Sequence, residues 1–149
     1  MLQKICIGTA LLMGVAAGAN GVFMLVSPAD WYLLVPGVPA TGPFNQHFIR
    51  DIGLIFLFIS AAFLSGAARP RYRILLWAAP TLWLAGHALF HLWEVAVGIC
   101  GPSDLVRDFP AVTLPAVIGA LLTLWAVQER ASRIGRATLN DALASAPLR

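Results

Sequence analysis

The chain has 149 residues, 59% hydrophobic and 11% charged, with a formal net charge of +3 at pH 7. Soluble proteins carry about 25% charged residues, and a soluble core of this size cannot bury so much apolar surface. The composition therefore predicts an integral membrane protein and excludes a soluble globular domain. Because the net charge is small, it gives no support to a nucleic-acid partner.

Four apolar runs predict membrane-spanning helices within a single membrane domain of residues 1–149. Each run is close to the length that crosses a hydrocarbon layer of roughly 30 Å. The runs cover about residues 5–26, 46–67, 74–97 and 110–127. Asn45, directly before the second run, is expected to cap that helix.

The first run also has features of a secretory signal peptide. Lys4 precedes it, and Ala17-Gly18-Ala19 resembles a small-residue cleavage site. The apolar residues continue to Val26, so we expect the run to be retained as a span, although the sequence does not decide whether residues 1–19 are cleaved. Small residues at Gly8, Gly14, Gly18 and Gly21 are expected to let a neighbouring helix approach closely.

The segments between the spans differ in character. Ser27 and Pro28 predict a capped helix start, and the rings that follow suit the headgroup layer, so residues 28–35 are expected to lie at the interface. Prolines and glycines in residues 36–43 predict an irregular, stiff loop that acts as a lid. Residues 98–109 are expected to form a loop. Residues 129–149 form a polar tail, compatible with a helix that continues to Ala144.

The basic residues predict the orientation, because Lys and Arg favour the cytoplasmic side of short loops. With the amino terminus inside, only Arg50 and Arg107 lie outside. The cytoplasmic side then holds eight of the ten basic residues: Lys4, Arg69, Arg71, Arg73, Arg130, Arg133, Arg136 and Arg149. The expected fold is therefore all-α, an antiparallel four-helix membrane bundle with both termini in the cytoplasm.

Ionisable residues gather on one face of the third span. His87, His91 and Glu94 are spaced four and three apart, which places them on one side of a helix. His47 and Asp51 likewise share a face at the start of the second span, with Arg50 beside them. Intramembrane ionisable groups are costly and mark a site of function or of polar packing.

The two polar stripes are expected to lie at one depth in the outer leaflet, because the second span enters from that side and the third returns to it. The candidate ligand site or polar cluster consists of His47, Arg50, Asp51, His87, His91 and Glu94. No residue is singled out as catalytic.

Several chemistries would use this cluster. Imidazole and carboxylate groups bind zinc, copper or iron, and the candidate metal ligands are His47, His87, His91 and Glu94. A haem held by two histidines and a proton relay would use the same residues. The structural alternative is a polar lock between helices, in which Arg50 pairs with Glu94 and Asp51 holds a histidine ring.

The second span resembles one known group of proteins. Phe48-Ile49-Arg50-Asp51-Ile52-Gly53-Leu54-Ile55-Phe56-Leu57 is similar to the second helix of the DoxX-like families, which are small four-helix bacterial membrane proteins. The resemblance implies a membrane subunit associated with a redox or oxidative-stress partner, and it supplies no catalytic residues.

The expected function is that of an accessory or assembly subunit of a larger complex in the bacterial cytoplasmic (inner) membrane. Its expected partners are the lipid bilayer and other membrane subunits or further copies of the chain. The alternative is a metal- or haem-binding membrane oxidoreductase or metal carrier. The sequence favours a protein that is not an enzyme, without deciding the question, and it names no cofactor.

Overall fold

The computed structural model describes the backbone of residues 1–144 and the side chains of residues 1–140. Every element in this range is a helix. The long helices are α1 (Leu2–Val26), α4 (Gln46–Ala68), α5 (Arg73–Ala96) and α7 (Thr113–Ala144), and the short ones are α2 (Pro28–Leu34), α3 (Val38–Thr41) and α6 (Pro102–Asp108). The end of the predicted tail, including Arg149, lies outside the described residues.

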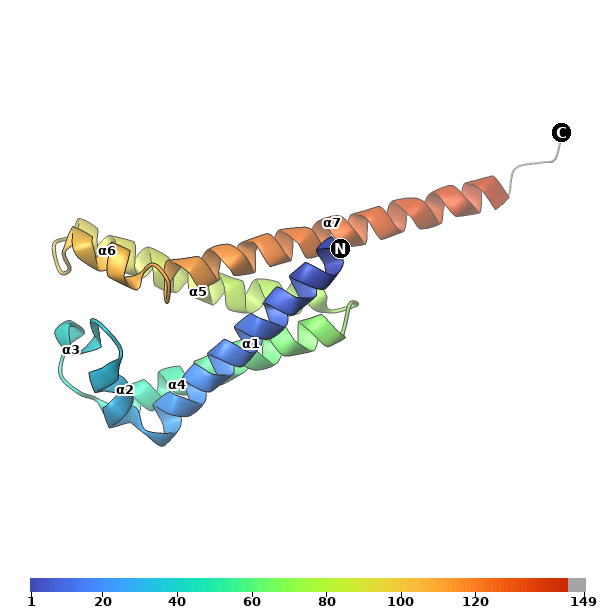
Figure 1. Ribbon diagram of the computed structural model, residues 1–149. Helices are drawn as coiled ribbons and strands as arrows, with labels where there is room; N and C mark the ends of the chain where they lie inside the picture. The colour runs from blue at the N-terminus through green and yellow to red at the C-terminus, as the bar shows by residue number, and fades with distance from the viewer. Residues whose placement is uncertain (145–149) are drawn as a thin grey trace.

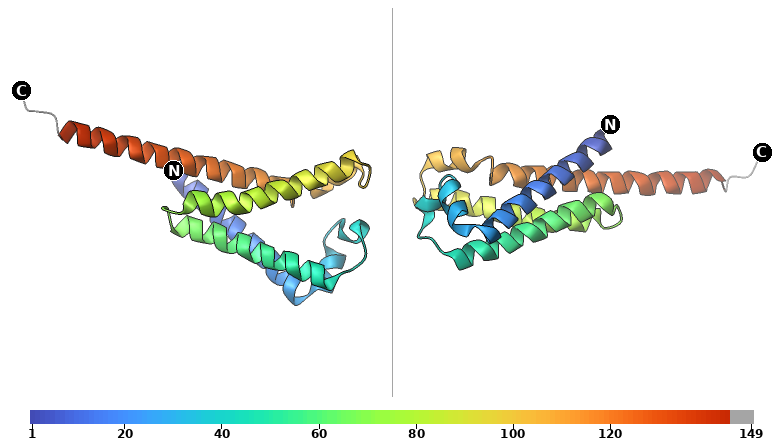
Figure 2. Two further views of the ribbon diagram at one scale, coloured as in Figure 1. Left: turned by 180° about the vertical axis from the view of Figure 1, so that it is seen from behind. Right: turned by 60° about the horizontal axis from the view of Figure 1, so that its bottom comes forward.

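The long helices form two pairs. α1 packs along α4 and α5 packs along α7, while α4 and α5 join the pairs. The ribbons of the two pairs diverge toward the end that carries α2, α3 and α6 (Figures 1 and 2). We call this the loop end, and the opposite end, where residues 69–72 connect α4 to α5, the turn end.

Three helices are long and apolar enough to cross a membrane: α1, α4 and α5. α6 and α7 meet the same criteria only together, as one span bent by 56°. The structure thus confirms the prediction of a membrane protein with transmembrane helices, and it has three or four candidate spans. Only 22–28% of the most apolar window of each single span is buried, so most of its surface is left for lipid or other helices.

Small residues bring α1 and α4 close together. A Cβ atom added to Gly21 would lie 2.7 Å from the carbonyl oxygen of Gly53, and one added to Gly18 would lie 2.8 Å from the hydroxyl oxygen of Ser60. Gly14 is similarly close to Leu64. The predicted close approach is confirmed at these three α1 glycines, as is usual where lipid-embedded helices pack. It is wrong at Gly8, where an added Cβ atom would have no atom of a neighbouring helix within 4 Å.

Trp77 joins α4 to α5 near the turn end. Its ring is fully buried, its indole N–H donates to the carbonyl oxygen of Phe63 at 3.1 Å, and it lies against Gly66. A buried indole needs such an acceptor, because its N–H is a donor only. The side chain therefore fills the core and satisfies its one polar atom.

The connecting segments are more helical than the sequence predicted. Residues 36–43 contain one helical turn, α3, which follows Gly37 at a φ of 87° and has Pro39 in its first turn, where the missing N–H costs nothing. Residues 98–109 contain α6, which has Pro102 at its start. The expectation of loops without regular structure was wrong, because proline stops a helix but also suits its first turn.

The fourth long helix begins at Thr113 and not at 110, and it continues without a break past residue 129 to Ala144. In Figure 1 it extends beyond the other helices at the turn end. Asn45 and Ser27 were both expected to cap helices. Asn45 does so, accepting from the Phe48 N–H at 3.1 Å, whereas the Ser27 hydroxyl bonds to the Asp30 carboxylate.

Candidate functional site

The predicted site residues of α4 stay on their own side of the loop end. His47 Nε2 lies 3.3 Å from Asp51 Oδ2, and both side chains are exposed. Asp51 thus lies beside a histidine ring, but the histidine is one turn earlier on the same helix, so this contact is not the suggested lock between helices. An exposed pair of this kind stabilises little.

Arg50 links α4 to the end of α1. Its Nε donates to the carbonyl oxygen of Leu25 at 3.2 Å, and its Nη1 donates to Gln46 at 3.4 Å. A cation beside the last carbonyls of a helix is favourable, because those oxygens have no partner within the helix. The suggested pairing of Arg50 with Glu94 is wrong.

The predicted residues of α5 form a ring stack. The His87 ring lies parallel to Trp83 with 5.3 Å between centroids, and it meets His91 edge-to-face at 4.8 Å. His91 Nδ1 in turn lies 3.3 Å from Asp108 Oδ2 of α6, and both side chains are mostly buried. The spacing of four along α5 thus continues into a polar contact with the next helix.

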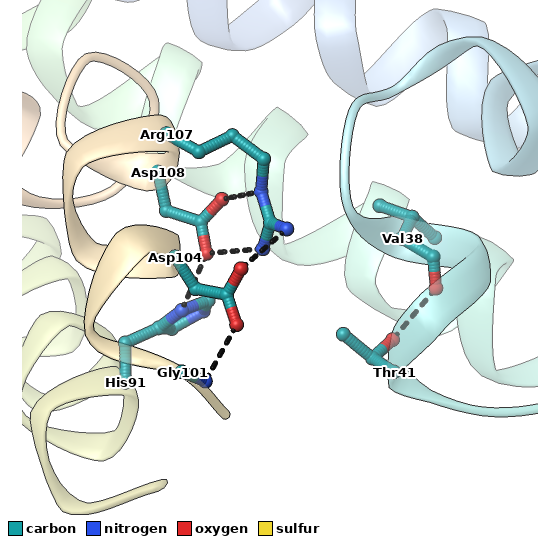
Figure 3. A network of polar contacts seen from close by, with 7 residues as sticks. All are labelled: Val38, Thr41, His91, Gly101, Asp104, Arg107 and Asp108. Carbon is teal, nitrogen blue, oxygen red and sulfur yellow. Dashed lines mark hydrogen bonds and ion pairs between the residues drawn. The ribbon is translucent and has the colours of Figure 1, made fainter. Parts of the chain in front are cut away.

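Arg107 organises the α6 side of this network (Figure 3). Its Nη1 donates to Asp104 Oδ1 at 2.7 Å, and its Nε and Nη2 donate to the two carboxylate oxygens of Asp108 at 2.7 and 3.0 Å. Asp104 also accepts from the Gly101 N–H at 2.8 Å, which satisfies a free donor at the start of α6. Two-point arginine–carboxylate bonds fix geometry as well as charge.

The same guanidinium reaches the segment between α2 and α3. A Cβ atom on Gly37 would lie 2.4 Å from Arg107 Cζ, so the guanidinium packs directly on the glycine backbone. Tyr32 holds this segment in place by donating to the Gly42 carbonyl oxygen at 2.8 Å. Arg107 therefore connects the two diverging helix pairs across the loop end, where the sequence predicted a lid.

The remaining candidate, Glu94, lies in the last turn of α5. Its backbone carbonyl accepts from the N–H groups of Ile99 and Cys100, with Gly98 at a φ of 78° completing the turn. Within residues 1–140, the Glu94 carboxylate makes no hydrogen bond or ion pair. Over the same range, no three His, Cys, Asp or Glu side chains gather closely enough to hold a metal ion. His47 thus does not join His87, His91 and Glu94 in one ligand set.

Cys100 lies in the turn after α5, outside the candidate spans and partly exposed. Its pKa is raised above the ordinary thiol value, first by desolvation and then by the negative charges of Glu94 and Asp104. Arg107 opposes this shift. Because the thiolate is the nucleophile, the thiol is less reactive near neutral pH than a free cysteine.

The turn end holds a second network that sequence reasoning missed. Arg73 is 3% exposed; its Nε donates to the Gly66 carbonyl oxygen at 3.0 Å and its Nη2 donates to that of Ala67 at 3.3 Å. Its Nη1 donates to Glu129 Oε2 of α7 at 2.9 Å. The guanidinium also lies over the rings of two tryptophans, Trp77 and Trp125, at 5.4 and 5.5 Å.

This second network joins three helices through one side chain. Arg133 completes it by donating to Glu129 Oε1 at 2.7 Å. The sequence offered only a weak signal, since Arg73 is one of three arginines in a basic turn and Glu129 begins a polar tail. Nothing local distinguishes Arg73 from Arg71, because the contact with Glu129 spans 56 residues.

No protein-family model, no curated protein and no solved structure matches this chain.

Proposed function

We propose that this protein is an accessory or assembly subunit of a larger complex in the bacterial cytoplasmic membrane, and that it acts through helix–helix contacts. The observation that carries the proposal is an apolar groove of about 450 Å³ between α1 and α7. Its walls include Ile5 and Cys6 of α1 and Leu121 and Trp125 of α7. We infer that apolar side chains of a helix from a partner subunit or from a second copy pack into this groove.

The polar networks support this proposal. The loop-end network ties α5 to α6 and touches Gly37, and Arg73 ties α4 to α5 and α7. These groups act as locks between helices, so the site residues keep the bundle in register for its partner. The DoxX-like resemblance of residues 48–57, which implies a redox or oxidative-stress partner, remains part of the proposal.

We further propose that the long helices form an antiparallel four-helix bundle with both termini in the cytoplasm. The two arginines assigned to the outside make close polar contacts at the loop end, Arg50 with Leu25 and Arg107 with Asp104 and Asp108. The turn end carries the unbalanced basic charge, as the positive-inside rule requires of a cytoplasmic surface. Single cysteines in place of Thr41 and Arg69, in a background lacking Cys6 and Cys100, test this. An impermeant maleimide should label position 41 from outside and position 69 only after the membrane is opened.

Photo-crosslinking from the groove tests the accessory role. A photoreactive residue at Leu121, which is 61% exposed and lines the groove, is compared with one at Leu82, which is 77% exposed and lies outside it. We expect one adduct of fixed mass from position 121 in membranes, and none of that mass from position 82. An adduct of twice the chain mass identifies a homo-oligomer. Equal, diffuse labelling from both positions would argue that the groove holds only lipid.

The second candidate is a metal- or haem-binding oxidoreductase or metal carrier. The observation that favours it is the pair of His87 and His91, whose ring centroids are 4.8 Å apart, although residues 1–140 bring no third ligand close enough to complete a metal site. Elemental analysis and an absorption spectrum of protein purified without added metal or chelator separate the two functions. Metal or haem near one per chain, lost in the His87→Ala/His91→Ala variant, would establish the second candidate. Without bound metal or haem, a variant that is merely less stable favours the lock.

A further inference from the structure

A small basic pocket lies at the turn end, beside the Arg73 network. It has a volume of about 240 Å³ and is lined by Pro70 and Arg71 of the turn and by Glu129, Arg130 and Arg133 of α7. We call it the arginine pocket. It is separate from the loop-end cluster and from the apolar groove between α1 and α7.

The charges in the arginine pocket do not balance. The one carboxylate, Glu129, is already paired, with one oxygen bound by Arg73 and the other by Arg133. Within residues 1–140, neither Arg71 nor Arg130 pairs with a carboxylate. Arg71 and Arg130 both line the pocket and are exposed, and the Arg71 guanidinium lies 5.5 Å from the centre of the Tyr72 ring. They therefore bring two positive charges to a pocket whose only carboxylate is already neutralised, and such a pocket favours an anion.

The chemistry of the two guanidinium groups indicates which anion. Arginine presents a planar fork of N–H donors that matches phosphate oxygens with two parallel hydrogen bonds. Two such forks on one pocket, from Arg71 and Arg130, suit a phosphate group better than a halide or a single carboxylate.

The position of the arginine pocket in the fold indicates the source of the phosphate. The candidate span α4 ends at Ala68, α5 begins at Arg73, and the apolar part of α7 gives way to polar residues after Val127. The pocket thus lies where the helices leave the apolar layer, at the level of lipid headgroups. Basic pockets between helices on the cytoplasmic side of a membrane bind anionic headgroups.

We propose that the arginine pocket binds the headgroup phosphate of an anionic phospholipid, with Arg71 and Arg130 as its ligands. Bound lipid would neutralise the two guanidinium groups and connect the α4–α5 turn to α7. This role is independent of the accessory function, because the arginine pocket and the apolar groove between α1 and α7 share no lining residue.

Lipid titration of the purified protein in detergent, followed by native mass spectrometry, tests the proposal. Phosphatidylglycerol is compared with phosphatidylcholine of the same acyl chains. The Arg71→Gln/Arg130→Gln variant is compared with Arg69→Gln/Arg136→Gln, which loses the same charge at the same end from residues that do not line the pocket.

The wild type should bind phosphatidylglycerol more tightly than phosphatidylcholine. The pocket variant should bind phosphatidylglycerol about tenfold or more weakly, as expected from losing hydrogen bonds to a charged group. The control variant should stay within about threefold of wild type, the range that general surface charge explains. Equal weakening in both variants, or equal binding of the two lipids, would overturn the proposal.

Two further experiments test which phosphate compound is bound and whether each arginine binds it through two hydrogen bonds. Inorganic phosphate at millimolar concentration should not displace the lipid, and displacement would instead make soluble phosphate the ligand. Arg71→Lys/Arg130→Lys keeps both charges but loses the forks, so its affinity should fall between those of wild type and the glutamine variant. Wild-type affinity in this variant would contradict the two-point contact. The lysine variant also keeps the proposal testable if the glutamine variant is too unstable to measure.

Discussion

At the turn end one buried arginine holds three helices together, whereas at the loop end the helix pairs diverge and meet through short helices and partly exposed side chains. Arg73 is 3% exposed and bonds to α4 and α7 from α5. Arg107 has a side chain that is 32% exposed, and its carboxylate partners lie on its own helix. The same residue type thus acts as a core element at one end and as a surface bridge at the other.

This difference indicates that the turn end is rigid and that the loop end is adaptable. Removing a buried charged group leaves its partners desolvated and unpaired, whereas an exposed group is replaced by water. The turn end should therefore resist perturbation until it fails completely. The loop end should open locally without unfolding the bundle.

The largest expected effect comes from Arg73→Ala. The substitution leaves two α4 carbonyls and one Glu129 oxygen without their donor, and breaking a buried ion pair typically costs about 3–5 kcal/mol. Arg133→Ala is the matched control, because it removes the exposed partner of the same carboxylate at a cost below about 1 kcal/mol. The midpoints of thermal unfolding in detergent provide the comparison. Similar midpoints for the two variants would refute the central role of Arg73.

The second effect concerns packing at the turn end. In Gly66→Ala the new methyl group would lie 2.4 Å from Trp77 Nε1, a buried ring that cannot move aside easily. Overpacking of this kind costs about 1–3 kcal/mol. Gly8→Ala is the control, since nothing lies within 4 Å of that site and alanine is the better helix former by about 1 kcal/mol. Unfolding of both variants measures the difference, and an unaffected Gly66→Ala would show that the interface relaxes.

The third effect opens the loop end. Gly37→Ala strains a residue at a φ of 87°, by roughly 1–2 kcal/mol, and displaces the Arg107 guanidinium. Gly98→Ala has similar strain at a φ of 78°, with nothing within 4 Å. Spin labels at Thr41 and Val106 should report a longer or broader distance only in the Gly37 variant. If the distance changes by the same amount in both variants, backbone strain and not the lost Arg107 contact is the cause.

The smallest effect is one of pH on the Cys100 thiol. Because its pKa is raised, less thiolate is present at pH 7–8 than in a free cysteine, and the rate of maleimide labelling should continue to rise at higher pH. Arg107→Gln should slow labelling further, since Arg107 lowers this pKa. Labelling rates across pH, compared with those of a small thiol, measure the shift. A rate equal to that of the small thiol at every pH would contradict it.

Local sequence patterns predicted the individual helices of the fold well and their contacts poorly. The apolar runs predicted three spans to within a few residues, and Asn45 was recognised as a cap. The same reasoning placed His47 and Glu94 in one cluster because they share a depth. Two residues at the same depth in the membrane can still lie far apart within the plane of the membrane. The helix pairs diverge at the loop end, and that divergence depends on packing at the turn end.

The candidate site was predictable where its members are close in the chain. The spacing of four brought His87 to His91 and His47 to Asp51, as helical periodicity requires. The sequence missed Asp108 and Arg73, because each pairs with a residue on another helix. It missed Arg107 because that side chain, whose carboxylate partners lie on its own helix, also packs on the distant Gly37. The glycines of α1 were partly predictable: small residues indicate that another helix approaches closely, but they do not indicate which helix it is.

The sequence by itself determined that this is a helical membrane protein, because composition and the length of apolar runs follow directly from the thickness and polarity of the bilayer. It also determined which residues share a helix face. Only the tertiary structure decided which faces meet, because lipid solvates apolar side chains about as well as another helix does, so hydrophobicity does not select a partner. Close glycine contacts and a few buried polar bonds make that choice, as Gly66, Trp77 and Arg73 do at the turn end.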